Sequence, residues 1–394
     1  MEASTGAGSR EARVFDVGGL WERLATLADA RHARGKRYPL ALVLLLMVLA
    51  KLGGEDRPSG IAEWVAHRRD ALQAALGVRW ARMPHHNTYR RVLAQAVEPG
   101  ELDAAVGAFL TSQPGVGRSV LVSIDGKTVR GTIDTPATRG EHLLAAYLPA
   151  EGIVLLQVAA GDKENEISVA PTLLRALDLR GKVVAGDALH TQRALSAQIL
   201  AAGGAYLWVA KANQPTLRAD IETLFTSDDH TVAGGRIHHD FRTARTVDHG
   251  HGRSDIRTLI ASSDLHGFSD WPGLHQVFRL ERQRVQIKSG KREHEVSYGL
   301  TSLSPAAASA AQLLALTRAH WGIENGLHHC RDVTFREDAT RLTQGQAGRV
   351  MAALNNLVIG LLRCAGHTNL AAARRLYNAN LLAAFALLAP PSRL

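Results

Sequence analysis

Three acidic residues occupy positions where an ionised carboxylate is energetically unfavourable unless it interacts with a partner. Asp125 follows the apolar run VLVSI and Asp187 follows VVAG, so each is expected at the mouth of a buried strand. A carboxylate placed there is partly desolvated and needs a cation or hydrogen bonds to stay ionised. If the two strands are neighbours, the carboxylates come together, and a shared divalent metal would relieve their repulsion.

The third acid, Glu324, lies in the helical segment RAHWGIENGLHHCRD. With about 100° per residue on a helix, one polar stripe is predicted to hold His320, Glu324, His328 and Arg331. Such a helix could deliver Glu324 to the aspartates and Arg331 to a phosphate. Two Mg²⁺ ions about 3.5 to 4 Å apart can activate a hydroxyl and steady a leaving oxygen. The three acids therefore predict phosphodiester chemistry with Mg²⁺, or with Mn²⁺ as a substitute.

Each acid also has an ordinary interpretation. Asp-Gly after a strand is common in turns, and an aspartate after VVAG can cap a helix. His320 and Glu324 can form a solvated pair on a helix. The predicted order of strands and helices favours the functional interpretation, because it places the ends of the first and fourth strands side by side.

The elements that would position these acids can be predicted from apolar spacing. Residues from Val14 to about Phe109 have helical spacing broken by glycines and prolines, which predicts an all-α domain of four or five helices. After TSQPGVGRS the order becomes β-β-β-α-β-α-β-α, which is typical of a mixed sheet with helices on its faces. Alternating stretches then predict a second, mostly antiparallel sheet inserted in this α/β domain.

The predicted domain boundaries follow these changes of pattern. They are 1–115 for a helical N-terminal domain whose basic helices are candidates for binding DNA, 116–225 for the first part of the catalytic domain, 226–303 for the β-rich insertion, 304–365 for the rest of the catalytic domain with the glutamate helix, and 366–394 for a helical tail.

Composition narrows the class of protein. The 394 residues hold 46 Lys plus Arg against 37 Asp plus Glu, a net charge of +9, so an acidic partner such as nucleic acid is expected. Two cysteines exclude a disulfide framework and favour a reducing compartment, which predicts a cytoplasmic protein, associated with the nucleoid when bound to DNA. The apolar run Pro39 to Ala50 is shorter than the roughly 20 residues that a membrane helix needs, so a core helix is expected and no membrane partner.

Six blocks of sequence, in chain order, resemble the H-repeat-associated group of bacterial insertion-sequence transposases. The blocks are VSIDGKTVRG, GDKENEISVAPTLL, VVAGDALHTQ, WVAKANQ, HGRSDIRT and TRAHWGIENGLHHCRDVTFREDATR. This group is a branch of the DDE transposases, and the resemblance covers nearly the whole chain. It implies a ribonuclease H-like catalytic domain in which Asp125, Asp187 and Glu324 are catalytic and hold the metals. It also implies double-stranded DNA partners, at the element ends and the target, and a homodimer in the DNA complex.

The sequence departs from the wider superfamily around the glutamate. That superfamily has a Tyr, Arg, Glu, Lys signature, whereas this chain has Thr317, His320, Glu324 and Arg331 at the equivalent spacing. The H-repeat-associated group resembles the form seen here, so loss of function does not follow. His320 can be a neutral hydrogen-bond donor or, if protonated, a cation.

Further polar residues are candidates for contacting DNA, with ordinary surface residues as the alternative. They are Lys127, Lys211, Asn213, Gln214, His320, His328 and Arg331 in the catalytic domain, and Arg68, Arg69, Arg90 and Arg91 in the helical domain. HHNTYRRVL could be a recognition helix opened by Asn87, although a capped helix with a charged face is the more common pattern. His238-His239 and His249-x-His251 raise a zinc hypothesis, but surface or DNA-facing histidines are favoured because no closed four-ligand set recurs.

Three functions remain open at this point. The first is a transposase that binds the ends of its element, frees a 3′-hydroxyl and joins it to target DNA, without a nucleotide cofactor because no GxxxxGK[ST] loop is present. The second is a domesticated DNA-binding protein that has lost transposition, against which the three retained acids argue. The third is a stand-alone nuclease of the same fold, which would cut without joining.

Overall fold

The computed structural model describes residues 17–77, 79–113, 116–134, 140–161, 164–226, 231–232, 235–236, 239–250 and 252–388. The chain divides into two compact units. Unit 1 comprises Met1–Arg118, Lys127–Ala159 and Glu324–Leu394, and unit 2 comprises Ser119–Gly126 and Ala160–Ile323. The predicted N-terminal tail, His238 and His251 lie outside the described residues.

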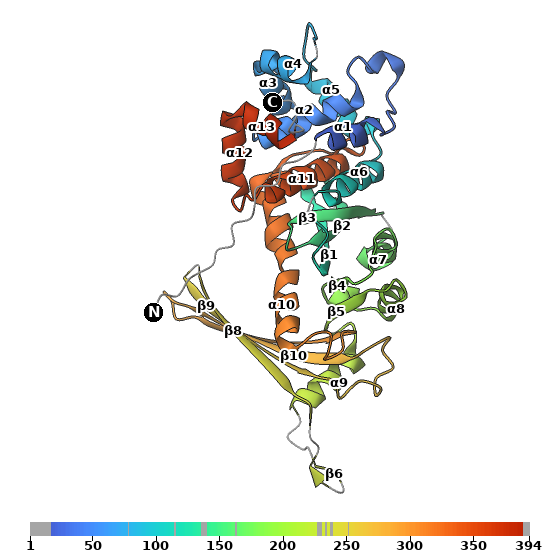
Figure 1. The fold of residues 1–394 in the computed structure, drawn as a ribbon, viewed down its shortest axis with the longest axis vertical. Coiled ribbons are helices and arrows are strands. Elements are labelled where there is room, and N and C mark those ends of the chain that lie inside the picture. Colours follow the sequence, from blue (N-terminus) through green and yellow to red (C-terminus); the bar gives the residue numbers. More distant parts are fainter. Residues whose placement is uncertain are drawn as a thin grey trace. The chain divides into compact units, whose positions relative to one another are not determined.

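Unit 1 is mainly helical (Figure 1). Its helices are α1 (Val17–Ala25), α2 (Leu40–Leu52), α3 (Pro58–His67), α4 (Arg69–Leu76), α5 (His86–Arg91), a π-helical turn (Val92–Ala96), α6 (Pro99–Thr111), α11 (Ala347–Cys364), α12 (Leu370–Ala379) and α13 (Leu381–Leu388). Every residue of α2 is buried, which confirms the predicted core helix. Helix α11 packs against α2 and α6. None of the helices within the described ranges has both the length and the apolar character needed to cross a membrane.

A β-hairpin completes unit 1. Strands β2 (Glu141–Leu148) and β3 (Ile153–Ala160) are neighbours, and the order within this unit is β3-β2-β1, where β1 is Leu121–Val129. The turn between them includes Gly152 at φ 73°, a backbone conformation that favours glycine. The hairpin predicted from the PAEG turn is therefore confirmed.

Unit 2 is a sheet with helices packed on it. In sheet order its strands are the first part of β1, β4 (Val183–Ala185), β5 (Ala205–Ala210), β11 (Arg292–Thr301), β10 (Gln276–Gln286), β9 (Arg253–Ser262) and β8 (Arg242–Gly250). Its helices are α7 (Glu166–Arg175), α8 (Arg193–Ala201), α9 (Pro215–Thr226) and α10 (Ala310–His320). The short strands β6 (Thr231–Val232) and β7 (Gly235–Arg236) pair with each other. The predicted order β-β-β-α-β-α-β-α is confirmed.

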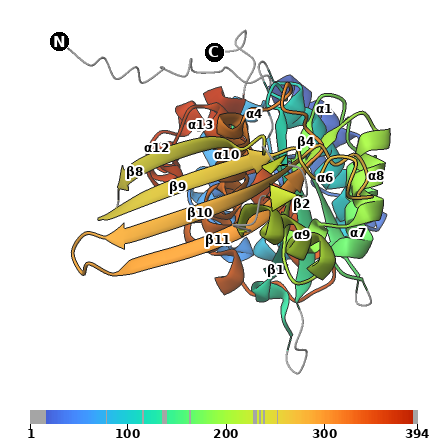
Figure 2. The same cartoon turned by 90° about the horizontal axis from the view of Figure 1, so that it is seen from below.

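The prediction of a second, separate sheet for the insertion is wrong. Strand β11 pairs antiparallel with β5 through Tyr298↔Ala210 to Thr301↔Leu207, so β8 to β11 extend the same sheet. Figure 2 shows these strands running side by side. The reason is burial at one end of β11, where Tyr298 to Thr301 are buried and cover the edge of β5. Alternating polarity predicts a strand, but it does not specify the strand with which it pairs.

Apolar side chains from both ends of this sheet form one core. Leu121, Val183, Leu207 and Phe278 pack in a cluster with Leu313 of α10. Helix α10 begins with a capping box between Ser309 and Gln312. Each unit is defined by packing and contains several separate stretches of the chain, whereas each boundary predicted from the sequence encloses one continuous range of residues.

Candidate active-site residues

Asp125 and Asp187 belong to neighbouring strands of unit 2. Strands β1 and β4 are parallel, and Ser123 pairs in register with Ala185. Each aspartate lies two residues beyond its strand's member of this pair. Because parallel strands run in the same direction, both acids stand at the same level of the sheet. The prediction that the first and fourth strands are neighbours is therefore confirmed. Asp187 lies just beyond the end of β4, as predicted, but Asp125 lies within β1, which continues to Val129, so the prediction that Asp125 ends its strand is wrong.

The two aspartates have different surroundings. Asp125 is half-buried, and its Oδ1 accepts a hydrogen bond from Gly126 N at 3.0 Å. The Asp187 side chain is 52% exposed, and its Oδ1 accepts from Leu189 N at 2.9 Å. Asp187 therefore caps the short turn that follows β4, as its ordinary interpretation predicted, and this cap fixes the direction of the carboxylate.

A buried histidine lies behind the Asp187 turn. His190 is fully buried, with its Nε2 3.1 Å from Glu166 Oε2 and 3.9 Å from Asp187 Oδ1. Glu166 is the first residue of α7, so this contact ties the turn to that helix. Our reasoning from the sequence missed both residues as members of the site, although both lie in blocks that carry the family resemblance, GDKENEISVAPTLL and GDALHTQ.

The loop after β5 holds the same turn from another side. The Asn213 side-chain amide donates to the Ala188 carbonyl at 2.6 Å, and that of Gln214 donates to the Thr191 carbonyl at 2.9 Å. These two residues were expected to line a DNA groove, and here their amides position the Asp187 turn. Lys211, from the same prediction, is exposed at the start of this loop.

His320 ends helix α10 of unit 2 and is buried. Burial, together with the nearby His190, lowers the pKa of His320 to about 4. Its imidazole is therefore neutral at pH 7, which favours the neutral alternative predicted from the sequence. The His320 Nδ1 atom has no hydrogen-bond partner among the described residues.

Glu324 begins the last segment of unit 1, in a π-helical turn that spans Glu324–His328. Its side chain is 60% exposed, and its Oε2 lies 3.2 Å from His328 Nδ1. Burial and the Arg331 charge lower the pKa of His328. The prediction of one polar stripe on a regular helix is wrong, because α10 ends at His320 and Cys330–Thr334 is π-helical again. π-Helical turns bond i to i+5, and they are frequent at functional sites.

Arg331, predicted to contact a phosphate, lies inside unit 1. Its side chain is 1% exposed, and its guanidinium donates to both carboxylate oxygens of Glu337 at 2.7 to 3.0 Å and to Gln157 Oε1 at 3.0 Å. Burial alone would raise the pKa of Glu337, but the charge and hydrogen bonds of Arg331 outweigh it and lower that pKa. This buried ion pair explains an arginine at this position without a phosphate ligand.

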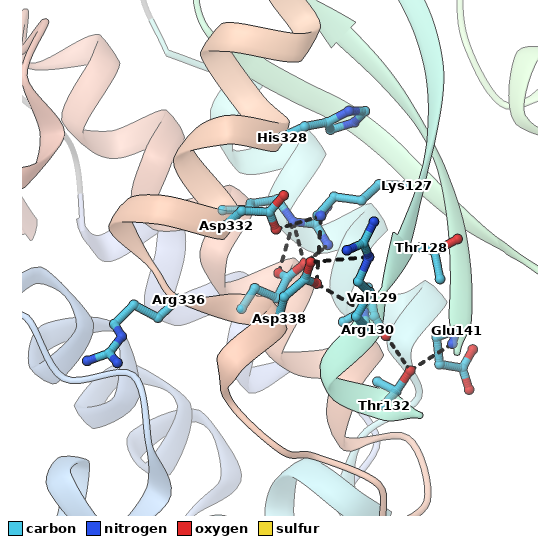
Figure 3. Close-up of polar contacts among 12 residues, drawn as sticks. Lys127, Thr128, Val129, Arg130, Thr132, Glu141, His328, Asp332, Arg336 and Asp338 are labelled. Carbon is cyan, nitrogen blue, oxygen red and sulfur yellow. Dashed lines mark hydrogen bonds and ion pairs between the residues drawn. The ribbon is translucent and has the colours of Figure 1, made fainter. Parts of the chain in front are cut away.

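Lys127 is also engaged within unit 1 (Figure 3). Its Nζ lies 2.6 Å from Asp332 Oδ1 and 3.8 Å from Asp338 Oδ1, and only 8% of the side chain is exposed. Arg130 N donates to Asp338 Oδ1 at 3.0 Å. Figure 3 shows the basic side chains of the β1 end and the two aspartates pointing toward one another, whereas Arg336 points away. The positive charge of Lys127 is therefore balanced by carboxylates.

The arginines of the helical segment differ in their surroundings. Arg68 stacks on Trp64 at 4.5 Å and donates to Asn378, whereas Arg69, Arg90 and Arg91 are exposed. Helix α5 begins at His86, and the imidazole of His85, not Asn87, accepts the capping bond from Asn87 N. The prediction of a helix opened by Asn87 is therefore wrong by two residues.

The predicted histidine pairs of the insertion are described only in part. His239 Nδ1 lies 2.5 Å from Asp264 Oδ2, so this histidine pairs with a carboxylate.

Comparison with known proteins identifies the class. Residues 117–361 match the family described as Transposase DDE domain, and residues 21–110 match the family described as DDE_Tnp_1-associated. The chain therefore belongs to the transposase DDE domain family and is a DDE transposase. The predicted membership of the H-repeat-associated group is confirmed by its relatives.

Two relatives from Escherichia coli cover most of this chain. YhhI of strain K12, whose name describes an H repeat-associated transposase, is 27% identical over 87% of this chain and 90% of its own length. YncI of strain O157:H7, also named as a transposase, is 27% identical over 89% of this chain and 88% of its own. A piggyBac transposase synaptic complex with hairpin DNA aligns with a TM-score of 0.43 and 12% identity, over 97% of this chain and 84% of that one. A likeness of that strength carries no weight for fold or function.

Proposed function

We propose that this transposase binds the double-stranded ends of its element, cleaves a phosphodiester to free a 3′-hydroxyl, and joins that hydroxyl to target DNA. Asp125, Asp187 and Glu324 are the proposed catalytic acids, on a ribonuclease H-like topology. The protein acts in the cytoplasm, at the nucleoid, as a homodimer that brings two ends together. The single observation that carries the proposal is the equal level of Asp125 and Asp187 on adjacent parallel strands.

The chemistry of these donors fits a divalent metal. Asp187 and Glu324 each expose more than half of the side chain, and neither forms an ion pair with a lysine or arginine in the described parts of the chain. Carboxylate oxygens are the ligands that Mg²⁺ and Mn²⁺ prefer. When bound, such ions would activate the attacking hydroxyl and stabilise the leaving oxygen.

The surrounding side chains hold the acids in place. Glu166 and His190 support the Asp187 turn from behind, and the amide of Asn213 supports it from the β5 loop. His328 lies four residues after Glu324, and its Nδ1 contacts Glu324 Oε2, which orients the Glu324 carboxylate. Precise placement matters because small displacements of catalytic groups cost large factors in rate.

The triad is tested by conservative substitutions that keep shape and remove charge. Asp125→Asn and Glu324→Gln should abolish 3′-end cleavage in Mg²⁺ while leaving binding to element ends unchanged. Asp178→Asn is a matched control, since Asp178 is exposed and pairs only with Arg180 in the described structure. Cleavage that survives either triad substitution would remove the assignment, and so would cleavage that persists in EDTA.

A strand-transfer assay separates the transposase from the alternatives. A transposase joins the cleaved end to a target duplex, a stand-alone nuclease stops after cleavage, and a domesticated DNA-binding protein does not cleave the inverted repeats that flank its gene.

A further inference from the structure

Unit 1 contains a cavity of about 590 Å³, and none of the residues proposed for catalysis lines it. Its lining comes from three stretches of chain: the start of α3, the α5 region and the segment that leads into α11. The polar side chains of the lining include Arg57, Ser59, Arg90, Arg341, Thr343 and Gln344. Ligand sites have volumes of about 300 to 1,000 Å³, so this cavity has the size of a binding site.

The lining carries positive charge and no carboxylate. Arg57, Arg90 and Arg341 are all exposed, and none of them forms an ion pair among the residues that the structure describes. Elsewhere in unit 1 arginines have acidic partners, such as Arg374 with Asp56 at 2.7 Å. Three unpaired guanidinium groups around one cavity repel each other, so an anion in the cavity would be stabilised.

Two helices begin at this cavity. Pro58 and Ser59 open α3, and Ala347 opens α11. Neither helix has a side-chain cap at its N-terminus or an acidic residue in its first turn, so backbone N–H groups and the positive ends of the helix dipoles remain there. Glu55 lies against Gly60 in the first turn of α3, and its negative charge reduces the positive potential at that helix end. Glu55 does not line the cavity, and the N-terminus of α11 is unaffected.

We propose that this cavity binds the phosphodiester backbone of the DNA on which the transposase acts. Arginine matches phosphate oxygens with paired hydrogen bonds, and helix N-termini bind phosphate through their N–H groups. The lining joins residues from both matched families, Arg57 and Arg90 from the associated region and Arg341 from the DDE domain. One stretch of backbone bound here contacts both regions. The choice of DNA as the ligand rests on the proposed function.

The cavity can be tested by binding alone, in EDTA, so that catalysis does not enter. The triple variant Arg57→Gln, Arg90→Gln, Arg341→Gln should bind a 40-base-pair duplex roughly 500-fold more weakly than the parent protein at 0.1 M salt, because each of three lost phosphate contacts is worth nearly tenfold there. The slope of log affinity against log salt should become shallower by about 3, because each phosphate contact contributes about 0.9. Fluorescence anisotropy across a salt series measures both quantities.

The matched control is Arg375→Gln. Arg375 is an exposed arginine of unit 1 on α12, has no ion pair in the described structure and does not line the cavity. Arg375→Gln should leave affinity for the duplex within about twofold, because it removes no contact in the cavity. Loss of one phosphate contact would instead weaken binding nearly tenfold at this salt. Circular dichroism and the urea midpoint of the triple variant should match those of the parent protein, which shows that it folds.

Equal affinity and slope for the triple variant and the control would overturn the proposal. So would a triple variant that binds the duplex normally but no longer binds inorganic phosphate or a mononucleotide, since the ligand would then be a small phosphate compound. If the salt slope falls as expected but no variant or parent protein cleaves DNA in Mg²⁺, the cavity stands and the proposed function fails. If cleavage depends on Asp125 but the salt slope of the triple variant does not change, the proposed function stands and the proposal for the cavity fails.

Discussion

The buried pair between Arg331 and Glu337 offers a test that separates a structural arginine from a phosphate ligand. The two side chains are 1% and 3% exposed, and Asn355 donates a further bond to Glu337 Oε2 at 2.7 Å. Glu337→Gln leaves the guanidinium buried without a counter-charge. Removal of one partner from a buried pair costs about 3 to 5 kcal/mol of the free energy of unfolding.

An exposed pair provides the comparison. The Asp178 and Arg180 side chains are 62% and 81% exposed, so solvent screens their attraction and Asp178→Asn should leave the urea midpoint nearly unchanged. Urea unfolding of the two variants, followed by circular dichroism, measures the difference. Since the pKa of Glu337 is lowered, the pair stabilises the folded state above the ordinary glutamate range and loses this contribution as the pH falls. The gap between the parent protein and Glu337→Gln should therefore narrow toward acid pH.

The outcome also decides what Arg331 does. If it is structural, Arg331→Lys lowers stability, because lysine cannot make the paired bonds to Glu337. If it binds a phosphate, Arg331→Lys weakens duplex binding while stability is kept, and Glu337→Gln costs no more than the exposed control. A loss below about 1 kcal/mol for Glu337→Gln would refute the reasoning from burial.

Three further predictions follow from other contacts. Burial raises the pKa of Asp103 to about 8 against its ordinary 3.8, so its contribution to stability is full below about pH 4 and is lost as the pH rises toward 8. In Asp103→Asn the melting temperature should therefore decline less between pH 5 and pH 8 than in the parent protein. An equal decline in the variant and the parent protein would contradict this prediction. Asn213→Ala removes the bond to Ala188 O and should slow 3′-end cleavage about tenfold or more with duplex affinity unchanged, as single-turnover kinetics and anisotropy can check. Gly107→Ala places a Cβ against the Leu155 carbonyl and should cost about 1 to 3 kcal/mol in urea unfolding, and an unchanged midpoint would argue against this packing.

Much of the local structure could be predicted from the sequence because its causes are local. The apolar run of α2 gives a helix buried along its whole length, and the β-branched runs before Asp125 and Asp187 give buried strands. Acids that directly follow such apolar runs can be recognised in the sequence, because the preceding residues indicate that the carboxylate is partly desolvated. The family blocks then identify the same acids independently.

Other features could not be predicted because they depend on which side chains become buried together when the chain packs. Arg331 follows the pattern of a phosphate ligand, yet Gln157 and Glu337 bury it. Asn213 follows the pattern of a groove residue, yet its amide holds the turn after β4.

The types of element, their order and the two aspartates that follow apolar runs could be predicted from the sequence alone, since these depend on neighbours along the chain. The pairing of β11 with the edge of β5, the burial of Arg331 and the gathering of Arg57, Arg90 and Arg341 around one cavity are visible only in the folded protein. Pairing and burial are set by which surfaces meet when the chain packs, and residues separated by hundreds of positions carry no local sign of that meeting.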